Sequence, residues 1–320
     1  MEDSFCEELL PYYPSPAEVE DIHSSYVANC VFNVFLSYAT IMLNIITIHA
    51  IRKSSSLPKP LKTLLLSLAV SDFGVGFIAQ PLYTWLLVKW LLQYNPGCVI
   101  YTLFSVFMNL FFTASFCSIT VVAVDRILAI QLHLRYQELV THRRVVAVVI
   151  SVWVFSALFS LRMFFLSSSV KYVTLIVGGS VSLLLTTLAY SRIYYVLRRH
   201  KSQIQSLQVQ QQLQQVTQNV EVASFASLRK SAVGTFYVYL VFLFCYLPRF
   251  ICLAALKIHG PSTYLKIFSL YSLTLMFLNS CLNPFIYCWK MKHIRHGIMN
   301  TLRNMTGYRN CFSQSNDSVL

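Results

Sequence analysis

The stretch from Cys98 to Ile130 constrains the fold more than any other part of the chain. Its first 27 residues contain no Asp, Glu, Lys or Arg, and the apolar run stops at Asp125-Arg126. A helix of roughly 20 apolar residues crosses the hydrocarbon core of a bilayer, so this run is long enough to span a membrane. Asn109 and Ser115 interrupt it, and such residues in membrane helices usually face neighbouring helices. The run predicts a transmembrane helix at the centre of a bundle.

Apolar runs of similar length recur along the whole chain. Seven can be delimited, at residues 26–51, 62–88, 98–130, 145–166, 172–197, 233–256 and 264–288. Hydrophobic residues make up 56% of the 320 residues and charged residues 12%, which excludes an ordinary soluble domain. The runs are also much longer than the strands of a membrane β-barrel. We therefore expect an all-α membrane protein with a seven-transmembrane helix bundle.

The distribution of charge predicts the orientation of this bundle. Residues 1–25 contain seven acidic side chains and no Lys or Arg. Alternate connections carry most of the cations, namely Arg52, Lys53, Lys59, Lys62, Arg135, Arg143, Arg144, Arg198, Arg199, Lys201, Arg229 and Lys230. Connections rich in Lys and Arg stay in the cytoplasm, so the N-terminus is expected outside the cell. The net charge of +13 then reflects topology and anionic membrane lipids, and no nucleic-acid partner is expected.

These features divide the chain into four parts. Residues 1–25 form an extracellular acidic tail, and residues 26–288 form the transmembrane domain, with its third intracellular loop at about 199–229. Residues 289–303 mix cations with apolar residues, which predicts a short amphipathic eighth helix on the inner membrane surface. Residues 304–320 form a cytoplasmic tail. For 199–229 we favour a solvated extension of the fifth helix that ends in a loop, because its apolar positions do not hold a heptad; a partner-binding helix is the alternative.

Six short motifs fall on these runs in order. They are Asn44, LSLAVSD ending at Asp72, Asp125-Arg126-Ile127, Trp153, Cys245-Tyr246-Leu247-Pro248 and Asn283-Pro284-Phe285-Ile286-Tyr287. Each motif alone is weak, but six in this order on seven runs are specific. From residue 26 to about 300 the sequence resembles the rhodopsin-like (class A) G-protein-coupled receptors. The resemblance implies a plasma-membrane receptor, not an enzyme, that binds an extracellular ligand, activates heterotrimeric G proteins by outward movement of helix six, and binds arrestin.

Asp72 lies deep in an apolar run, where an unpaired carboxylate is costly. One interpretation is a protonated or hydrogen-bonded acid in the core. The resemblance implies the other, an allosteric sodium site whose further members are Ser115, Asn279, Ser280 and Asn283. Several oxygen ligands around a carboxylate suit a hard cation.

The resemblance also implies the parts of a G-protein switch. Arg126 is expected to be held by Asp125 at rest and then released to contact the G protein. The remaining switch residues are Leu134, Tyr190 and Tyr287, and the expected rotating core of helix six consists of Phe242, Tyr246 and Pro248. Tyr246 stands where this family usually has Trp, which puts the geometry of that core in question. Plain packing is the alternative for each aromatic residue, since aromatic residues make up 14% of the chain.

The ligand pocket is the least constrained part of the resemblance. Met108 stands where amine receptors carry an aspartate, and Phe277 stands where opsins carry the retinal-binding lysine, so neither ligand is expected. Arg249 directly follows Pro248, at a position that faces the ligand cavity in this family. The outer halves of the spans offer no carboxylate to neutralise it. An arginine within a membrane span is a candidate functional residue.

Two interpretations of Arg249 stay open. Its guanidinium either reaches towards outer water or the acidic tail, or it binds a carboxylate, phosphate or sulfate of the ligand, for which its planar fork is suited. In the second case Asn109, Phe112, Phe250 and Leu253 complete a mostly apolar pocket. A small lipid-like acid and an acidic peptide both fit this description.

Departures from the family pattern narrow the resemblance. The fifth run has Ser182 where Pro is typical, and the second outer loop lacks the cysteine that normally bridges to helix three. This combination is similar to the melanocortin, cannabinoid, lysophospholipid and adenosine receptors. The similarity leaves Cys98 with Cys6 as a candidate disulfide partner. The ending Ser318-Val319-Leu320 fits a ligand of PDZ domains, which bind such ends as an added strand.

Other functional classes find less support. A transporter would show internal repeats or broken helices, and no repeat is visible. A membrane enzyme needs a cluster of catalytic groups, yet Asp72 and Asp125 are the only acids in the seven runs. A seven-helix decoy or scaffold that does not signal is the remaining alternative, and the intact Arg126 and Tyr287 argue against it.

Leu228 generates a prediction about basal activity. It lies twenty residues before Pro248, where many members of the family carry an acid that restrains the arginine of the switch. Without that charge-assisted contact we expect G-protein activation in the absence of ligand. Leu228→Glu should lower basal nucleotide exchange by the G protein at matched surface expression, whereas Leu228→Gln should not. Equal basal exchange in the wild type and Leu228→Glu would contradict this explanation.

Overall fold

The computed structural model describes residues 18–54, 57–94, 97–132, 135–165, 168–210, 215–290, 295 and 297–299. Its elements are α2 (Val19–Lys53), α3 (Lys59–Gly74), the π-helix η2 (Val75–Ala79), α4 (Gln80–Leu91), α5 (Cys98–Leu132), α6 (Tyr136–Leu139), α7 (His142–Phe165), α8 (Ser168–Gln210), α9 (Gln215–His259) and α10 (Thr263–Lys290). Within these residues seven helices are long and apolar enough to cross a membrane, and no β-strand occurs. The predicted fold class is confirmed.

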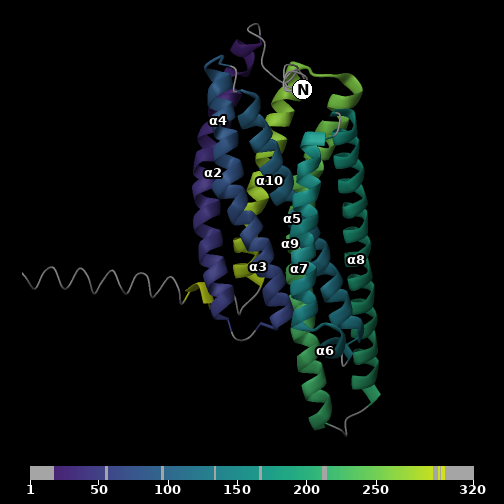
Figure 1. The fold of residues 1–320 in the computed structure, drawn as a ribbon. Coiled ribbons are helices and arrows are strands. Elements are labelled where there is room, and N and C mark those ends of the chain that lie inside the picture. The colour runs from purple at the N-terminus through teal and green to yellow at the C-terminus, as the bar shows by residue number, and fades with distance from the viewer. Residues whose placement is uncertain are drawn as a thin grey trace, which may run out of the picture.

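Helix α5 is the central element of the bundle. It packs against α3, α7, α8 and α9, and Figure 1 shows it running among them. Helix α10 packs against α2 and α9 and completes the other side. The central position of α5 agrees with the prediction made from its small and polar residues.

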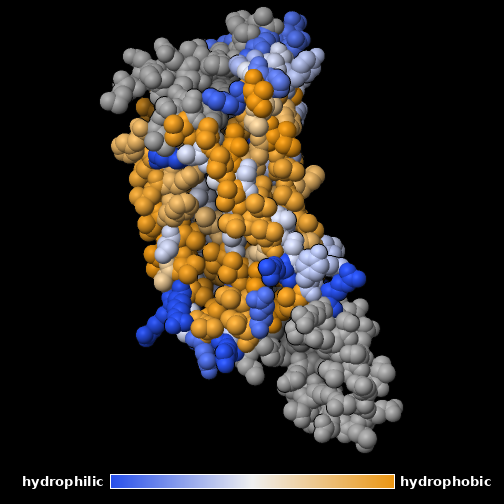
Figure 2. Space-filling model, turned by 90° about the vertical axis from the view of Figure 1, so that its right-hand side faces the viewer, coloured by the Kyte–Doolittle hydropathy of each residue, from blue (hydrophilic) through white to orange (hydrophobic). Residues whose placement is uncertain are grey.

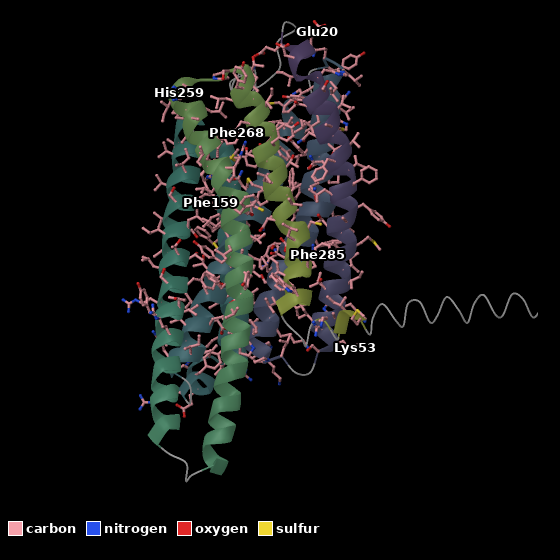
Figure 3. The ribbon with its side chains drawn as sticks, turned by 180° about the vertical axis from the view of Figure 1, so that it is seen from behind. Glu20, Lys53, Phe159, His259, Phe268 and Phe285 are labelled. Atoms are coloured by element: carbon pink, nitrogen blue, oxygen red, sulfur yellow. The ribbon has the colours of Figure 1, made fainter. Side chains whose placement is uncertain are left out.

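The bundle has two polar ends and an apolar middle. Figure 2 shows a broad hydrophobic band between hydrophilic side chains above and below it. Figure 3 places Glu20 and His259 at one end of the bundle and Lys53 towards the other. Many large apolar side chains in the band are exposed, among them Phe35, Leu184 and Phe244. In a membrane such side chains contact lipid instead of water.

Polar side chains within the spans join one helix to another. Asn29 Nδ2 donates to Thr274 Oγ1 at 2.7 Å and Asn44 Nδ2 donates to the Ser280 carbonyl at 3.0 Å, so both link α2 to α10. Trp153 Nε1 of α7 donates to Ser67 Oγ of α3 at 3.1 Å. Hydrogen bonds of this kind hold membrane helices together, because hydrocarbon offers polar groups no other partner.

The second span changes its hydrogen-bond register just before Pro81. In η2 the Gln80 N–H donates to the Val75 carbonyl, five residues back. The next donor in that register would be Pro81, which has no N–H, so the Gly76 carbonyl loses its partner within the helix. Ser37 Oγ of α2 donates to that carbonyl at 2.8 Å instead. The second span therefore contains a π-helical turn just before Pro81, and the neighbouring α2 supports it.

Two helices continue well beyond their candidate membrane spans. The candidate spans end at Val196 in α8 and begin at Thr235 in α9, yet α8 runs to Gln210 and α9 starts at Gln215. Most of the segment 199–229 is therefore helical. The predicted eighth helix at 289–303 lies largely outside the described residues and stays a prediction.

Gly74 gives a test of how tightly α3 and α5 pack. A Cβ at this position would overlap the ring of Phe111, which is itself buried. Gly74→Ala should lower the stability of the solubilised receptor by about 1–3 kcal/mol, the usual cost of overpacking. A thermal unfolding assay in detergent measures the effect. Gly178→Ala is the matched control, because its new Cβ would meet nothing within 4 Å. Equal melting temperatures for the two variants would show that Phe111 can move aside at little cost.

Candidate functional site

A cavity of about 380 Å³ lies in the half of the bundle nearest Glu20 and His259. Cavities of this size hold small ligands in other proteins. Most of its lining is apolar or aromatic, including Phe159, which Figure 3 labels. The lining residues that the sequence predicted are Met108, Asn109, Phe112, Arg249, Phe250 and Leu253. Phe277 is not among the lining residues: it is fully buried and packs against Tyr83 and Phe112.

Three cationic side chains line this apolar cavity. Arg249 comes from α9, Arg162 from the last turn of α7 and Lys171 from the first turn of α8. Among the residues that the structure describes, no Asp or Glu lines the same cavity. The partners that the described residues provide for Arg249 and Arg162 are uncharged, so these two guanidinium groups favour an anion in the cavity.

Arg249 has a polar but uncharged partner in the described part of the chain. Its Nη1 donates to Ser269 Oγ of α10 at 2.7 Å, and its side chain also borders a second, smaller cavity. Glu18, which precedes the first residue of α2, accepts hydrogen bonds from Thr263 Oγ1 at 2.9 Å and from Lys266 Nζ at 2.7 Å. The geometry supports the interpretation that Arg249 faces the cavity.

Arg162 was not predicted, and it is the most closely held of the three cations. Its Nη2 donates to Asn109 Oδ1 at 3.1 Å and its Nε donates to Thr174 Oγ1 at 3.4 Å. The guanidinium carbon lies 3.7 Å from the centre of the Phe159 ring. Its Nη1 is buried and has no hydrogen-bond partner among the described residues. These contacts fix the plane of the guanidinium and leave the two N–H groups of Nη1 for a ligand.

An aromatic column runs from this cavity towards the middle of the bundle. Phe250 packs edge-on against Phe116 at 6.1 Å between ring centres, and Phe116 packs against Phe242 at 4.5 Å. Phe242 stacks on Tyr246 at 4.0 Å, so Tyr246 belongs to the same column. Phe116 was missed in the sequence, although it follows Phe112 by four residues and shares its helix face. The column joins α5 to α9 on both sides of Pro248.

Below the column, polar side chains surround Asp72. Asn283 Nδ2 donates to Asp72 Oδ2 at 2.7 Å, and Ser115 forms a hydrogen bond with Ser71 at 2.9 Å. Several buried oxygens have no hydrogen-bond partner among the described residues, namely Asp72 Oδ1, Asn279 Oδ1, Ser280 Oγ and Asn283 Oδ1. Buried polar atoms without partners usually contact water or an ion. Carboxylate, amide and hydroxyl oxygens fit a hard cation such as sodium.

The C-terminal end of α5 carries a buried ion pair. Arg126 contacts Asp125 through its Nε and Nη2 atoms, and both side chains are almost fully buried. Tyr136 of α6 donates to the other carboxylate oxygen of Asp125 at 2.7 Å. Burial and the charge of Asp125 raise the pKa of Tyr136, so its hydroxyl remains a donor. Asp125 is therefore held by Arg126 of α5 and by Tyr136 of α6.

Tyr190 and Tyr287, the two tyrosines of the predicted switch, differ in their contacts. Tyr190 of α8 donates from its hydroxyl to the Thr235 carbonyl of α9 at 2.9 Å. The hydroxyl of Tyr287 is buried and has no hydrogen-bond partner among the described residues. Tyr190 thus ties α8 to the part of α9 that precedes Pro248, while the Tyr287 hydroxyl is available for a new contact.

Comparison with known proteins identifies the family. A family model described as 7 transmembrane receptor (rhodopsin family) matches residues 43–174 and 166–287. The chain belongs to this family. Rhodopsin-family receptors are G-protein-coupled receptors of the plasma membrane, and a G protein and an extracellular ligand are their partners.

Individual receptors show which branches the chain is similar to. It is 29% identical over 274 residues to melanocortin receptor 5 of Ovis aries, covering 82% of this chain and 81% of the relative. It is 26% identical over 313 residues to adenosine receptor A3 of Canis lupus familiaris, covering 89% of this chain and 92% of that receptor. Melanocortin receptor 3 of Homo sapiens is 26% identical to it over 287 residues, covering 86% of this chain and 85% of that receptor. Both branches belong to the group that the departures in the sequence suggested.

Some predicted features of the receptor fall on parts that the structure does not describe. Cys98 is disulfide-bonded, but Cys6, its predicted partner, lies outside the described residues. Leu134 and the ending Ser318-Val319-Leu320 also lie outside them. These assignments stay predictions.

Phe116 provides a test of the aromatic column. It is only partly buried but contacts Phe242, Tyr246 and Phe250. Phe116→Ala should destabilise the solubilised receptor by about 3 kcal/mol, the lower end of the usual range for such truncations. Phe35→Ala is the control, since Phe35 lies on the exposed face of α2. Thermal unfolding in detergent compares them, and a loss no greater than that of Phe35→Ala would show that the column does not join α5 to α9.

Proposed function

We propose that this G-protein-coupled receptor is activated by an extracellular ligand whose anionic group binds among Arg249, Arg162 and Lys171. The observation that carries the proposal is the lining of the cavity: three cations, no acid among the described lining residues, and apolar walls. Bidentate hydrogen bonds from guanidinium match a carboxylate, phosphate or sulfate. The lining disfavours a cationic ligand, which would meet only repulsion.

The orientation proposed for the receptor supports access of such a ligand. Lys and Arg gather in the connections at the end marked by Lys53, and the first turn of α2, with the acidic Glu20 and Asp21, lies at the opposite end. By the positive-inside rule the N-terminus is extracellular. The cavity then lies in the outer half of the bundle, and the Asp125–Arg126 pair lies at the cytoplasmic end.

The contacts of α9 suggest how binding reaches the G protein. Arg249 and Phe250 lie directly after Pro248, and a proline within a helix permits bending there. An anion held between Arg249 on α9 and Arg162 on α7 draws the outer part of α9 inwards. The part before Pro248 then swings the other way, which separates Phe242 from Phe116 and breaks the bond between Tyr190 and the Thr235 carbonyl. The opening exposes Arg126 to the G protein.

The cluster around Asp72 is proposed as the allosteric sodium site, with Ser115, Asn279, Ser280 and Asn283 as its other members. The unpartnered oxygens of this cluster are the observation that supports it. A bound sodium ion supplies a positive charge that balances the buried carboxylate. The chain's own residues there bridge α3, α5 and α10, so a filled site holds the resting arrangement of these helices.

Several partners remain proposals. Arrestin is expected to share the cytoplasmic opening with the G protein, and Ser318-Val319-Leu320 is offered as a ligand for a PDZ domain. A decoy or scaffold that binds ligand without signalling is the alternative to a signalling receptor. The ion pair at Arg126 and the buried Tyr287 favour signalling, since both belong to the predicted switch.

Arg249→Lys tests the proposed ligand contact. Lysine keeps the charge but loses the planar fork, so the half-maximal concentration of an anionic agonist should rise about tenfold or more, equivalent to at least roughly 1.4 kcal/mol. The agonist is chosen by screening fatty acids, lysophosphatidates, organic sulfates and acidic peptides for receptor-dependent nucleotide exchange. Arg52→Lys at the cytoplasmic end is the control. An unchanged response to the selected agonist would refute direct contact with Arg249.

Asp72→Asn tests the proposed sodium site. The variant keeps hydrogen-bonding capacity but removes the negative charge that a cation requires. In the wild type, replacing sodium chloride with choline chloride at constant ionic strength should raise basal nucleotide exchange. The variant should be insensitive to that replacement. Equal sensitivity in both proteins would rule out Asp72 as the sodium ligand.

A further inference from the structure

We infer that the ligand is a single-chain anionic amphiphile that reaches the cavity from the bilayer, through a portal between α7 and α8. The portal consists of Phe155 on α7 and Gly178, Val181 and Leu185 on α8. The inference rests on the proposed function for the role of the cavity in signalling. Its own evidence is where the cavity opens and where its charges lie.

The cavity extends from the core of the bundle to its outer wall. Tyr246 and Met108 line it at the buried end. Phe155, Val181 and Leu185 line the same cavity, and their side chains are 53%, 50% and 54% exposed. In a membrane, exposed apolar side chains within the spans contact lipid. The cavity is therefore open to acyl chains.

The portal exists because the backbones of α7 and α8 lie apart along most of their length. Both helices pack against α5, and the contact between them in the described part of the chain is the hydrogen bond from Arg162 Nε to Thr174 Oγ1 near their outer ends. Gly178 contributes no side chain to the gap, and a Cβ there would meet nothing within 4 Å. At the adjacent Gly179 the ring of Phe250 occupies the space that a Cβ would fill. The two glycines thus open the wall of α8 and bring the aromatic column up to it.

The charges lie at the depth of lipid headgroups. Arg162 precedes the end of α7 by three residues and Lys171 follows the start of α8 by three. Each is therefore roughly 4.5 Å from its helix end, close to the polar boundary of the membrane. Phe155 lies seven residues before Arg162, roughly 10 Å deeper along α7. An amphiphile in the outer leaflet has its anionic head and its tail at these same two depths.

This matching of depths favours a lateral route over access from water. An amphiphile that moves sideways keeps its tail in an apolar environment and transfers its head from the interface to Arg162. The unpartnered Nη1 of Arg162 then gains a charge-assisted hydrogen bond. An acidic peptide would instead place backbone N–H and C=O groups against apolar walls, which is costly without hydrogen bonds. The lining therefore favours the lipid-like acid over the peptide.

Photolabelling tests the portal directly. The full chain is reconstituted in phosphatidylcholine nanodiscs with either of two probes, a palmitate or a lysophosphatidate that carries a mid-chain diazirine, and the labelled residues are mapped by peptide mass spectrometry. We expect adducts on the cavity walls near Phe116, Cys117 and Phe159, in excess of those at the lipid-facing Val177 and Leu184. Gly178→Phe places a ring in the gap and should abolish the cavity adducts. Val177→Phe, one residue away on the exposed face, should leave them.

The outcomes separate the portal from the receptor proposal. Labelling no greater in the cavity than at Val177 and Leu184 would overturn the portal, and so would cavity labelling that Gly178→Phe leaves unchanged. A melting temperature equal to that of the wild type checks that Gly178→Phe folds. Arg162→Gln should reduce cavity labelling by about tenfold, as for loss of one charge-assisted contact. Cavity labelling by both probes without any nucleotide exchange would support the portal as an entry route and contradict the proposal that an anionic ligand activates the receptor.

Discussion

The hydrocarbon core of the membrane offers no hydrogen-bond partners, and the rest of the structure depends on that constraint. It is the reason that each span is a helix and that polar side chains such as Asn29, Asn44 and Trp153 bond to neighbouring helices. Buried polar atoms left without partners are then informative. Among the described residues they gather around Asp72, with Tyr246 and Tyr287 close enough to feel its charge, and they recur at Arg162. The oxygens around Asp72 suit a cation, and the guanidinium of Arg162 suits an anion.

The two sites are joined by packing. The aromatic column of Phe250, Phe116, Phe242 and Tyr246 begins beside the cationic lining and ends above the Asp72 cluster. Packed aromatic side chains cannot deform continuously, so a shift of α9 at Pro248 has to change which faces are in contact. The Tyr246 hydroxyl is buried without a hydrogen-bond partner among the described residues, close enough to Asp72 to feel its charge. The departure that put the geometry of the helix-six core in question thus places a hydroxyl between the column and the Asp72 cluster.

The sequence predicted what depends on pattern and motif, and missed what depends on packing. Uninterrupted apolar runs gave the seven spans, and Arg249 was found because it is a single cation inside a span. Arg162 and Lys171 lie beside a short connection, and only their contacts show that both side chains turn into the cavity. Phe277 was assigned to the pocket by family position, but Tyr83 and Phe112 cover it. The gap between α7 and α8 could not be predicted, because it results from how the two helices are spaced against α5.

If the cavity controls the G-protein switch at Arg126, loss of that arginine must abolish signalling without abolishing ligand binding. Nucleotide exchange is measured in membranes with wild type and Arg126→Ala at equal surface expression, with and without an anionic amphiphile selected on the wild type. We expect the amphiphile to raise exchange in the wild type. Both basal and stimulated exchange should vanish in Arg126→Ala, although labelling of the cavity persists. Stimulated exchange that survives in Arg126→Ala would show that the cavity does not act through this arginine.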